Sequence, residues 1–354
     1  MEGTKNVRES NLELLRILAM LLIIFYHYCI YLDWSATEYT INKILYVALG
    51  SWGALFVDVF IIISAWFLCE SSAKFSIWKV LKIICETSFY AVAMYGVLCV
   101  TKNTVFAPKM LLQALFSPIL GTYWFITAYL AFYLLCPLLN ILVQHLNQKQ
   151  FQTFIGILTI IIPVFQMFVR GNPNWGIIST FAYLFIFTAG LKRHKDSWLE
   201  RNAVFIAIVD FLFLILMGYL CRKSGHVEFL NFFLEKSSIF IILEAFSIFF
   251  VFKNWKIKSS KLINKMAASV FGVYILHQYR LSLPILWDKI FRTSEAYQSS
   301  FFVIYLLLTG IAILTLGIIV DMLRIKLLEK PFFGLLEKSA VGGLIKKWDA
   351  GMTS

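Results

Sequence analysis

Long runs of apolar residues, separated by short polar segments, follow one another along the whole chain. Crossing the hydrocarbon of a bilayer takes about 20 residues at 1.5 Å rise each, and only helices and closed barrels satisfy their backbone groups there. The pattern therefore predicts an all-α polytopic membrane protein with about ten transmembrane helices in one bundle. The expected spans cover residues 12–32, 50–70, 77–100, 122–144, 151–169, 176–191, 203–221, 229–251, 266–288 and 300–326.

Two further segments are only partly apolar and are too short to cross a bilayer. They read "YTINKILYVAL", residues 39–49, and "PKMLLQALFSPIL", residues 108–120. We expect each to be an interfacial helix or a loop that covers a site. The chain then divides into one membrane domain, residues 1–335, and a short basic cytoplasmic tail, residues 336–354, that is interfacial or disordered.

Composition supports a membrane protein and excludes several other classes. Of the 354 residues 60% are apolar and 15% are charged, with a mean hydropathy of +0.78, whereas soluble domains have about 45–50% and 25%. The net charge of +12 does not indicate nucleic-acid binding, because Lys and Arg gather between the apolar runs rather than on a recognisable module. The six cysteines form neither a CxxC pair nor a Cys/His cluster, so neither a disulfide framework nor a metal site is expected.

The distribution of Lys and Arg predicts the orientation, because cytoplasmic loops retain these residues. They are most frequent in residues 192–201, 253–265 and 324–347, which lie on the same side as the N-terminus if ten spans are crossed. We therefore expect both termini in the cytoplasm. The first apolar run is too long for a signal-peptide core and no cleavage site follows it, so it is expected to remain as a span.

The first span, "NLELLRILAMLLIIFYHYC", carries three ionisable residues, Glu13, Arg16 and His27. Arg16 and His27 are about 1100° apart on a helix, roughly 20° past three full turns, so they share one face with Glu13 and lie about 16 Å apart along the axis. Ionisable side chains in spans cost several kcal/mol and usually face a bundle interior or a cavity. A guanidinium suits phosphate and an imidazole suits proton transfer. The alternative is that Arg16 snorkels to anionic lipid while His27 bonds a neighbouring helix.

Two residues of other spans are candidates for the same site. Asp58 lies at a depth close to His27, so its carboxylate could orient the imidazole ring and stabilise the imidazolium; a hydrogen bond that packs two helices is the alternative. Trp124 lies at the start of the fourth span, where an aromatic-belt residue is more common than a site residue.

The opening "NLELLRILAMLLIIFYHY" resembles the first span of acyltransferase family 3, integral-membrane enzymes that acylate bacterial surface polysaccharides and related acceptors. In that family a basic residue is followed, after ten positions, by a histidine, which is the spacing of Arg16 and His27. The segment "GALFVDVFIIISAWF" is similar to the family's second span, with Asp58 and Ser64 on matching positions and Ala65 where glycine is usual.

Later segments resemble the family in the same order and extend the similarity over nearly the whole chain. "YWFITAYLAFYLLCPLLN" is similar to the Trp-Phe helix, "SVFGVYILHQ" to the Tyr-x-x-His helix with Tyr274 and His277, and "LLEKPFF" to the terminal Glu-x-Pro. One departure is that "WKVLK" supplies Lys79 and Lys82 where the family commonly has Arg-x-x-Arg. Lysine keeps the positive charge but, unlike arginine, does not form two parallel hydrogen bonds to one phosphate.

The resemblance implies an O-acyltransferase of the bacterial plasma membrane. The acyl-CoA co-substrate, usually acetyl-CoA, would be reached from the cytoplasm, and the acceptor would be a hydroxyl of a cell-surface polysaccharide or its lipid-linked precursor. The implied roles are as follows: His27 as general base or acyl carrier with Asp58; Arg16, Lys79, Lys82 and Glu13 at the donor; Ser64, Trp124, Tyr274 and His277 at the substrate. Two rival functions remain, a transporter or flippase of a lipid-linked sugar and a scaffold without chemistry.

Overall fold

The computed structural model describes residues 9–69, 75–165, 168, 176–193 and 197–351. Three of the expected segments extend beyond these limits. Residue 70 of the second span, residues 166–167 and 169 of the fifth span and residues 352–354 of the tail lie outside the described residues.

The described residues form helices and turns and contain no strand, which confirms the all-α prediction. The α-helices are α1 (Ser10–Cys29), α2 (Thr40–Leu68), α3 (Ile77–Val100), α4 (Pro108–Leu115), α5 (Trp124–His145), α6 (Gln148–Thr159), α8 (Ile177–Arg193), α9 (Trp198–Arg201), α10 (Ala203–Lys223), α11 (Leu230–Leu234), α12 (Ile239–Asn254), α13 (Lys261–Ala267), α14 (Val270–His277), α15 (Thr293–Tyr297), α16 (Phe302–Arg324), α17 (Lys330–Lys338) and α18 (Ala340–Gly351). Short 3-10 turns, η1 (Trp34–Ala36) and η3 (Val227–Phe229), and π-helical turns, η2 (Ile160–Phe165), η4 (Ile285–Ile290) and η5 (Ile325–Glu329), connect or extend them.

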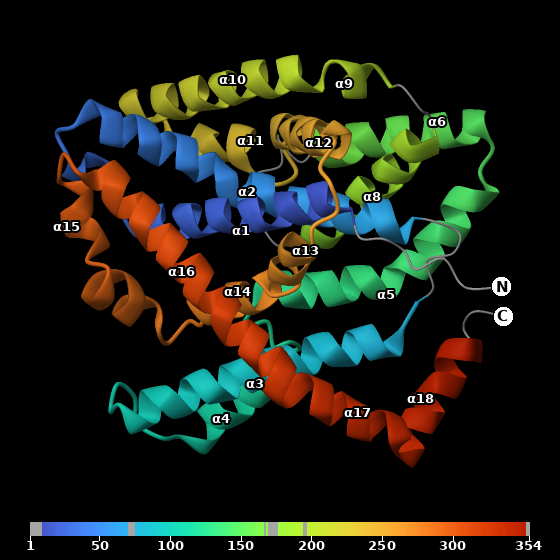
Figure 1. Ribbon diagram of the computed structural model, residues 1–354. Coiled ribbons are helices and arrows are strands. Elements are labelled where there is room, and N and C mark those ends of the chain that lie inside the picture. The colour runs from blue at the N-terminus through green and yellow to red at the C-terminus, as the bar shows by residue number, and fades with distance from the viewer. Residues whose placement is uncertain (1–8, 70–74, 166–167, 169–175, 194–196, 352–354) are drawn as a thin grey trace.

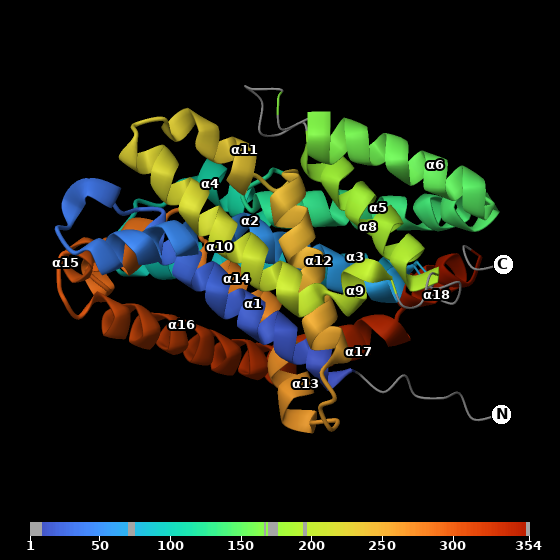
Figure 2. The same ribbon diagram turned by 90° about the horizontal axis from the view of Figure 1, so that it is seen from above.

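Helix α1 lies at the centre of the bundle, with α10 on one side and α3 and α4 on the other (Figure 1). It packs against α2, α12, α13, α14 and α16. One face of α1 contributes to an apolar cluster with α2, α5, α8 and α12, and another face contributes to a cluster with α3, α14 and α16. The view from above shows α16 running along one flank of α1 and α6 at the opposite edge of the bundle (Figure 2). The central position explains why α1 can carry charged groups away from lipid.

Six helices among the described residues are long and apolar enough to cross a membrane, fewer than the ten spans expected. They are Ser10–Cys29, Thr40–Leu68, Ile77–Val100, Trp124–His145, Ala203–Lys223 and Phe302–Lys338. Together they support a multi-pass membrane protein. The remaining four apolar segments form shorter or interrupted helices, so the expected count of ten and the orientation of the termini stay predictions.

Proline and irregular backbone interrupt several of the expected spans. The segment 151–169 is α-helical only to Thr159 and then forms the π-helical turn that contains Pro163. The segment 266–288 is divided into α13, α14 and η4, and η4 begins directly after Pro284. Proline lacks a backbone donor and disfavours the helical conformation of the residue before it. Hydropathy averaged over about 20 residues does not detect these interruptions, because most side chains in both segments are apolar.

The two short partly apolar segments have different outcomes. Residues 40–49 form the beginning of α2, which runs without interruption to Leu68. The expected separate interfacial helix is therefore wrong, because the helix begins ten residues before the apolar run does. Residues 108–115 form the separate helix α4, which packs beside α3.

The basic tail includes a helix, α18, that is attached to the beginning of α3. The carboxylate of Asp349 accepts hydrogen bonds from the backbone N–H of Ile77 at 2.8 Å and from the hydroxyl of Ser76 at 3.1 Å. A carboxylate at a helix N-terminus satisfies backbone donors that have no partner within the helix and complements the positive end of the helix dipole. Residues 340–351 thus form a helix that packs against the beginning of α3.

Two glycines bring neighbouring helices close to the end of α1 that carries His27. A Cβ on Gly53 of α2 would overlap the ring of Tyr26, and a Cβ on Gly310 of α16 would overlap the ring of Phe25. Small residues commonly allow such close packing between membrane helices. The two contacts hold the last turns of α1 between α2 and α16.

Candidate functional site

A cavity of about 920 Å³ extends along one face of α1. On α1 it is lined by residues at helical spacing, from Glu13 and Arg16 to Tyr26 and His27, and on α2 by a similar stripe from Tyr46 to Ser64. Because α1 is helical throughout, Arg16 and His27 lie about 16 Å apart along its axis. The two side chains therefore share one cavity, as the helical spacing of the sequence predicts. We refer to its two ends as the Arg16 end and the His27 end.

The Arg16 guanidinium is partly neutralised within its own helix. Its Nη1 donates to both carboxylate oxygens of Glu13, at 3.0 and 3.1 Å. The guanidinium carbon lies 5.8 Å from the centre of the Phe67 ring, where it makes a cation–π contact. Glu13 thus fixes the position of Arg16 at the cavity wall and is itself buried.

Lys79 and Lys82 of α3 also line the Arg16 end, and both are exposed. Lys82 Nζ lies 3.9 Å from Glu329 Oε1 and 5.4 Å from the centre of the Phe333 ring. Within the described part of the chain, Lys79 forms no ion pair. The two lysines and Arg16 therefore give this end of the cavity three cationic groups from two helices.

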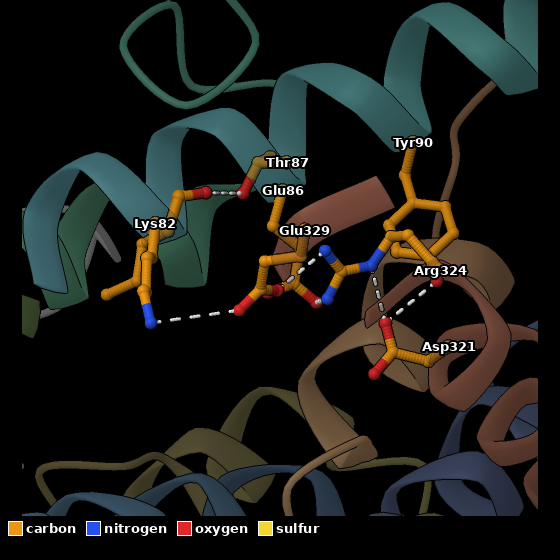
Figure 3. Close-up of polar contacts among 8 residues, drawn as sticks. Lys82, Glu86, Thr87, Tyr90, Asp321, Arg324 and Glu329 are labelled. Carbon is orange, nitrogen blue, oxygen red and sulfur yellow. Dashed lines mark hydrogen bonds and ion pairs between the residues drawn. The ribbon is translucent and has the colours of Figure 1, made fainter. Parts of the chain in front are cut away.

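Next to Lys82, one arginine is surrounded by three carboxylates (Figure 3). Arg324 contacts Glu86 at 3.0 Å, Asp321 at 2.8 Å and Glu329 at 2.8 Å, and only 7% of its side chain is exposed. Tyr90 adds a hydrogen bond from its hydroxyl to Asp321 Oδ1 at 2.8 Å. This ion-pair cluster ties α3, α16 and η5 together, and Glu86 also lines the cavity.

At the His27 end, the ring of His27 contacts a second histidine 250 residues away. Its Nδ1 lies 3.0 Å from Nε2 of His277, and Nδ1 of His277 lies 2.7 Å from the backbone carbonyl oxygen of Val273. A carbonyl oxygen only accepts, so Nδ1 of His277 carries a proton and, in the neutral pair, its Nε2 accepts. Nδ1 of His27 is therefore the donor to His277. This assignment of tautomers follows from the hydrogen-bond network.

The consequence is that the lone pair of His27 lies on Nε2. In the described residues Nε2 has no hydrogen-bond partner, and His27 lines the cavity. His277 is buried and does not line the cavity. In the structure His277 contacts His27 rather than the cavity, and its predicted role at the substrate stays a prediction.

Among the described residues, Asp58 forms no hydrogen bond with either histidine. Its side chain is fully buried, and neither carboxylate oxygen has a hydrogen-bond partner among the described residues. Asp58 also does not line the cavity. The expected contact in which Asp58 orients the ring of His27 is replaced by the contact with His277.

The other residues predicted at the substrate line the cavity. Ser64 donates to the carbonyl oxygen of Phe60 at 2.9 Å, within its own helix. Trp124 is 42% exposed and lies 5.0 Å from Lys236 Nζ, measured to the ring centre. Tyr274 is buried against His277, with the two rings nearly perpendicular. These positions are compatible with the predicted roles and do not test them.

Several polar residues of the cavity were not predicted from the sequence, among them Tyr129, Glu86 and Arg222. Glu235 and Lys236 are adjacent in the sequence, and on a continuous helix neighbouring side chains do not face each other. Glu235 is extended instead, and its carboxylate lies 3.1 Å from Lys236 Nζ. The sequence shows two charged residues within an apolar run. It does not show the break between α11 and α12 that lets their side chains pair.

Residues 9–321 match the family model of an acyltransferase domain, acyltransferase family 3. The chain belongs to this family. No curated protein and no solved structure matches. Membership of acyltransferase family 3 confirms the resemblance in the sequence and indicates a membrane acyltransferase. In the described residues of this family member, no group of three His, Cys, Asp or Glu side chains is arranged to hold a metal ion.

Replacing His277 tests whether it positions His27. His277→Leu removes the acceptor for Nδ1, whereas His277→Gln keeps an oxygen near the position of Nε2. Partners that fix the tautomer of a functional histidine are worth about 10–100-fold at metal sites, and we expect His277→Leu to lower kcat by this order without changing the donor KM. His277→Gln should recover part of the loss. Equal losses in the two variants would show that His277 only fills space.

Proposed function

We propose that this protein transfers an acyl group, acetyl in the simplest case, from acyl-CoA to a hydroxyl of a cell-surface polysaccharide or its lipid-linked precursor. The observation that carries the proposal is the single cavity with cationic groups at one end and a histidine with a free lone pair at the other. In the bacterial plasma membrane the Arg16 end would face the cytoplasm, where acyl-CoA is made, and the His27 end would face outward.

The Arg16 end suits the phosphates of the donor. Arg16, Lys79 and Lys82 line it together, and cations at the mouth of a cavity attract phosphate and hold it by charge-assisted hydrogen bonds. The pantetheine arm would then extend along α1 and place the thioester near His27. Acyl-CoA itself need not cross the bilayer in this arrangement.

The chemistry at the His27 end is general base catalysis. Nε2 of His27 takes the proton of the acceptor hydroxyl as its oxygen attacks the thioester carbonyl, and His277 accepts a hydrogen bond from the resulting imidazolium. Collapse of the tetrahedral intermediate breaks the carbon–sulfur bond, and the proton on Nε2 passes to the thiolate, which leaves as free coenzyme A. A positioned base contributes typically 10²–10⁴-fold to such a step.

Acetyl-CoA labelled in the acetyl group tests the proposal with the purified protein in neutral-lipid nanodiscs. We expect release of free coenzyme A, detected as thiol, and transfer of label to a polysaccharide or glycolipid fraction. Acetyl-CoA and longer acyl-CoA should be compared to identify the acyl group. A protein that binds no acyl-CoA and turns over none of these thioesters would contradict the proposal.

The two lysines of α3 are expected to act on donor binding rather than on chemistry. Lys82→Ala or Lys79→Ala should raise the KM for acyl-CoA about tenfold, because a hydrogen bond between charged groups is lost, and should leave kcat nearly unchanged. Lys102→Ala, on the turn beyond the other end of α3, provides the control. An unchanged donor KM in both variants would separate these lysines from the phosphates.

A further inference from the structure

The cavity also contains a guanidinium at the end away from Lys79 and Lys82. Arg222, in the last turn of α10, lines the cavity together with Tyr46 and Gly50 of α2. Its guanidinium carbon is 5.2 Å from the centre of the Tyr46 ring, and a Cβ built on Gly50 would lie only 3.7 Å from Nη2. The guanidinium is thus held against the cavity wall between α2 and α10.

Among the described residues, no acidic side chain forms an ion pair with Arg222. Its Nη1 donates a hydrogen bond to the backbone carbonyl oxygen of Gly218 at 3.2 Å, and the guanidinium also interacts with the hydroxyl of Tyr46. Of the carboxylates near this end of the cavity, Glu235 is paired with Lys236, and Asp33 accepts hydrogen bonds from Ser35. Within the described residues no carboxylate lies within 4.0 Å of Arg222, in contrast to Arg324 with its three. A guanidinium that is fixed and not neutralised is suited to bind an anion through its fork of donors.

Arg222 lies near the His27 end of the cavity, where the proposed function places the reacting hydroxyl of the acceptor. Gly53, three residues after Gly50 on α2, contacts Tyr26, which directly precedes His27. Three residues of helix correspond to about 4.5 Å. The guanidinium thus lies about one helical turn beyond the level of Tyr26, away from Arg16. This offset is comparable with the size of one sugar ring.

We propose that Arg222 binds an anionic group of the acceptor, a phosphate or a carboxylate carried by the sugar that is acylated or by its immediate neighbour. This inference rests on the proposed function, because it assigns the acceptor to the His27 end. The acceptor is then an acidic sugar or a sugar phosphate rather than a neutral sugar. The anion positions the ring so that one hydroxyl lies against Nε2 of His27.

Binding can be measured without catalysis, so that failure of this inference and failure of the proposed function remain distinguishable. The probes are glucose 1-phosphate, glucuronate and glucose, added to the whole protein in neutral-lipid nanodiscs, with the dissociation constants taken from ligand-induced shifts of the unfolding midpoint. We expect the two acids to bind more tightly than glucose. Arg222→Met should weaken binding of the acids about tenfold or more, and Arg222→Lys should be intermediate.

Three controls determine where the anion binds. Lys223→Met removes the neighbouring charge, which does not line the cavity, and should have no effect. The double variant Lys79→Ala, Lys82→Ala should also keep the preference for the acids. Loss of the preference in that double variant but not in Arg222→Met would overturn the proposal in favour of the donor end.

A membrane lipid is the other source of a phosphate at the end of a helix. Nanodiscs that contain phosphatidylglycerol therefore form a separate arm. If this lipid stabilises the wild type through Arg222 while glucose 1-phosphate and glucuronate bind no better than glucose, Arg222 is a lipid contact and the proposal is wrong.

Discussion

His27→Ala is expected to lower the rate of acyl transfer by about 10²–10⁴-fold, the usual contribution of a positioned general acid or base. The physical reason is that Nε2 of His27 holds the lone pair in the cavity while its Nδ1 is engaged with His277. The donor KM should change little, because Arg16 lies about 16 Å away along α1 and the two lysines line the same end of the cavity as Arg16. Steady-state kinetics with labelled acetyl-CoA, at saturating and limiting donor, separate the two constants.

Two exposed histidines provide controls for this variant. His145 Nδ1 lies 2.8 Å from the carbonyl oxygen of Ile141 in its own helix, and His226 lies 3.1 Å from Glu228 on the surface. His145→Ala and His226→Ala should retain wild-type rates. If His27→Ala inserts in the membrane, keeps its unfolding midpoint and still transfers acyl groups at the wild-type rate, the assignment of His27 is wrong.

Arg324→Met is expected to destabilise the protein by about 3–5 kcal/mol, the cost typical of breaking a buried ion pair from one side. Removing the guanidinium leaves Glu86, Asp321 and Glu329 close together, and Lys82, which is exposed and 3.9 Å from Glu329, compensates their charge only in part (Figure 3). The midpoint of thermal unfolding in detergent measures the effect. Adding Glu86→Gln and Glu329→Gln to Arg324→Met should recover part of the loss, because it removes uncompensated charge.

The exposed pair of Arg292 and Glu295 is a matched control with the same spacing as Arg324 and Asp321. Its atoms lie 2.7 Å apart, but the two side chains are 65% and 63% exposed. Arg292→Met should therefore cost no more than about 1 kcal/mol. Similar midpoints for Arg324→Met and Arg292→Met would show that burial does not make the cluster around Arg324 important.

Features that depend on the local geometry of one helix could be predicted from the sequence. The apolar runs indicated membrane helices, and the spacing of Arg16 and His27 placed them on one face of α1 because every residue of an α-helix turns by the same angle. The same spacing, with Asp58, Ser64, Tyr274 and the other ordered motifs, indicated acyltransferase family 3, which the family model confirmed.

Features that depend on contacts between helices were decided only by the tertiary structure. Nδ1 of His27 bonds to His277 rather than to Asp58, and Arg222 reaches the cavity from the end of α10. The interior of a membrane protein is apolar on almost every helix, so hydropathy does not specify which helices touch. Nor does it show where a helix can break, as at Glu235, since a break in the bilayer is tolerated only where neighbouring segments satisfy the freed backbone groups.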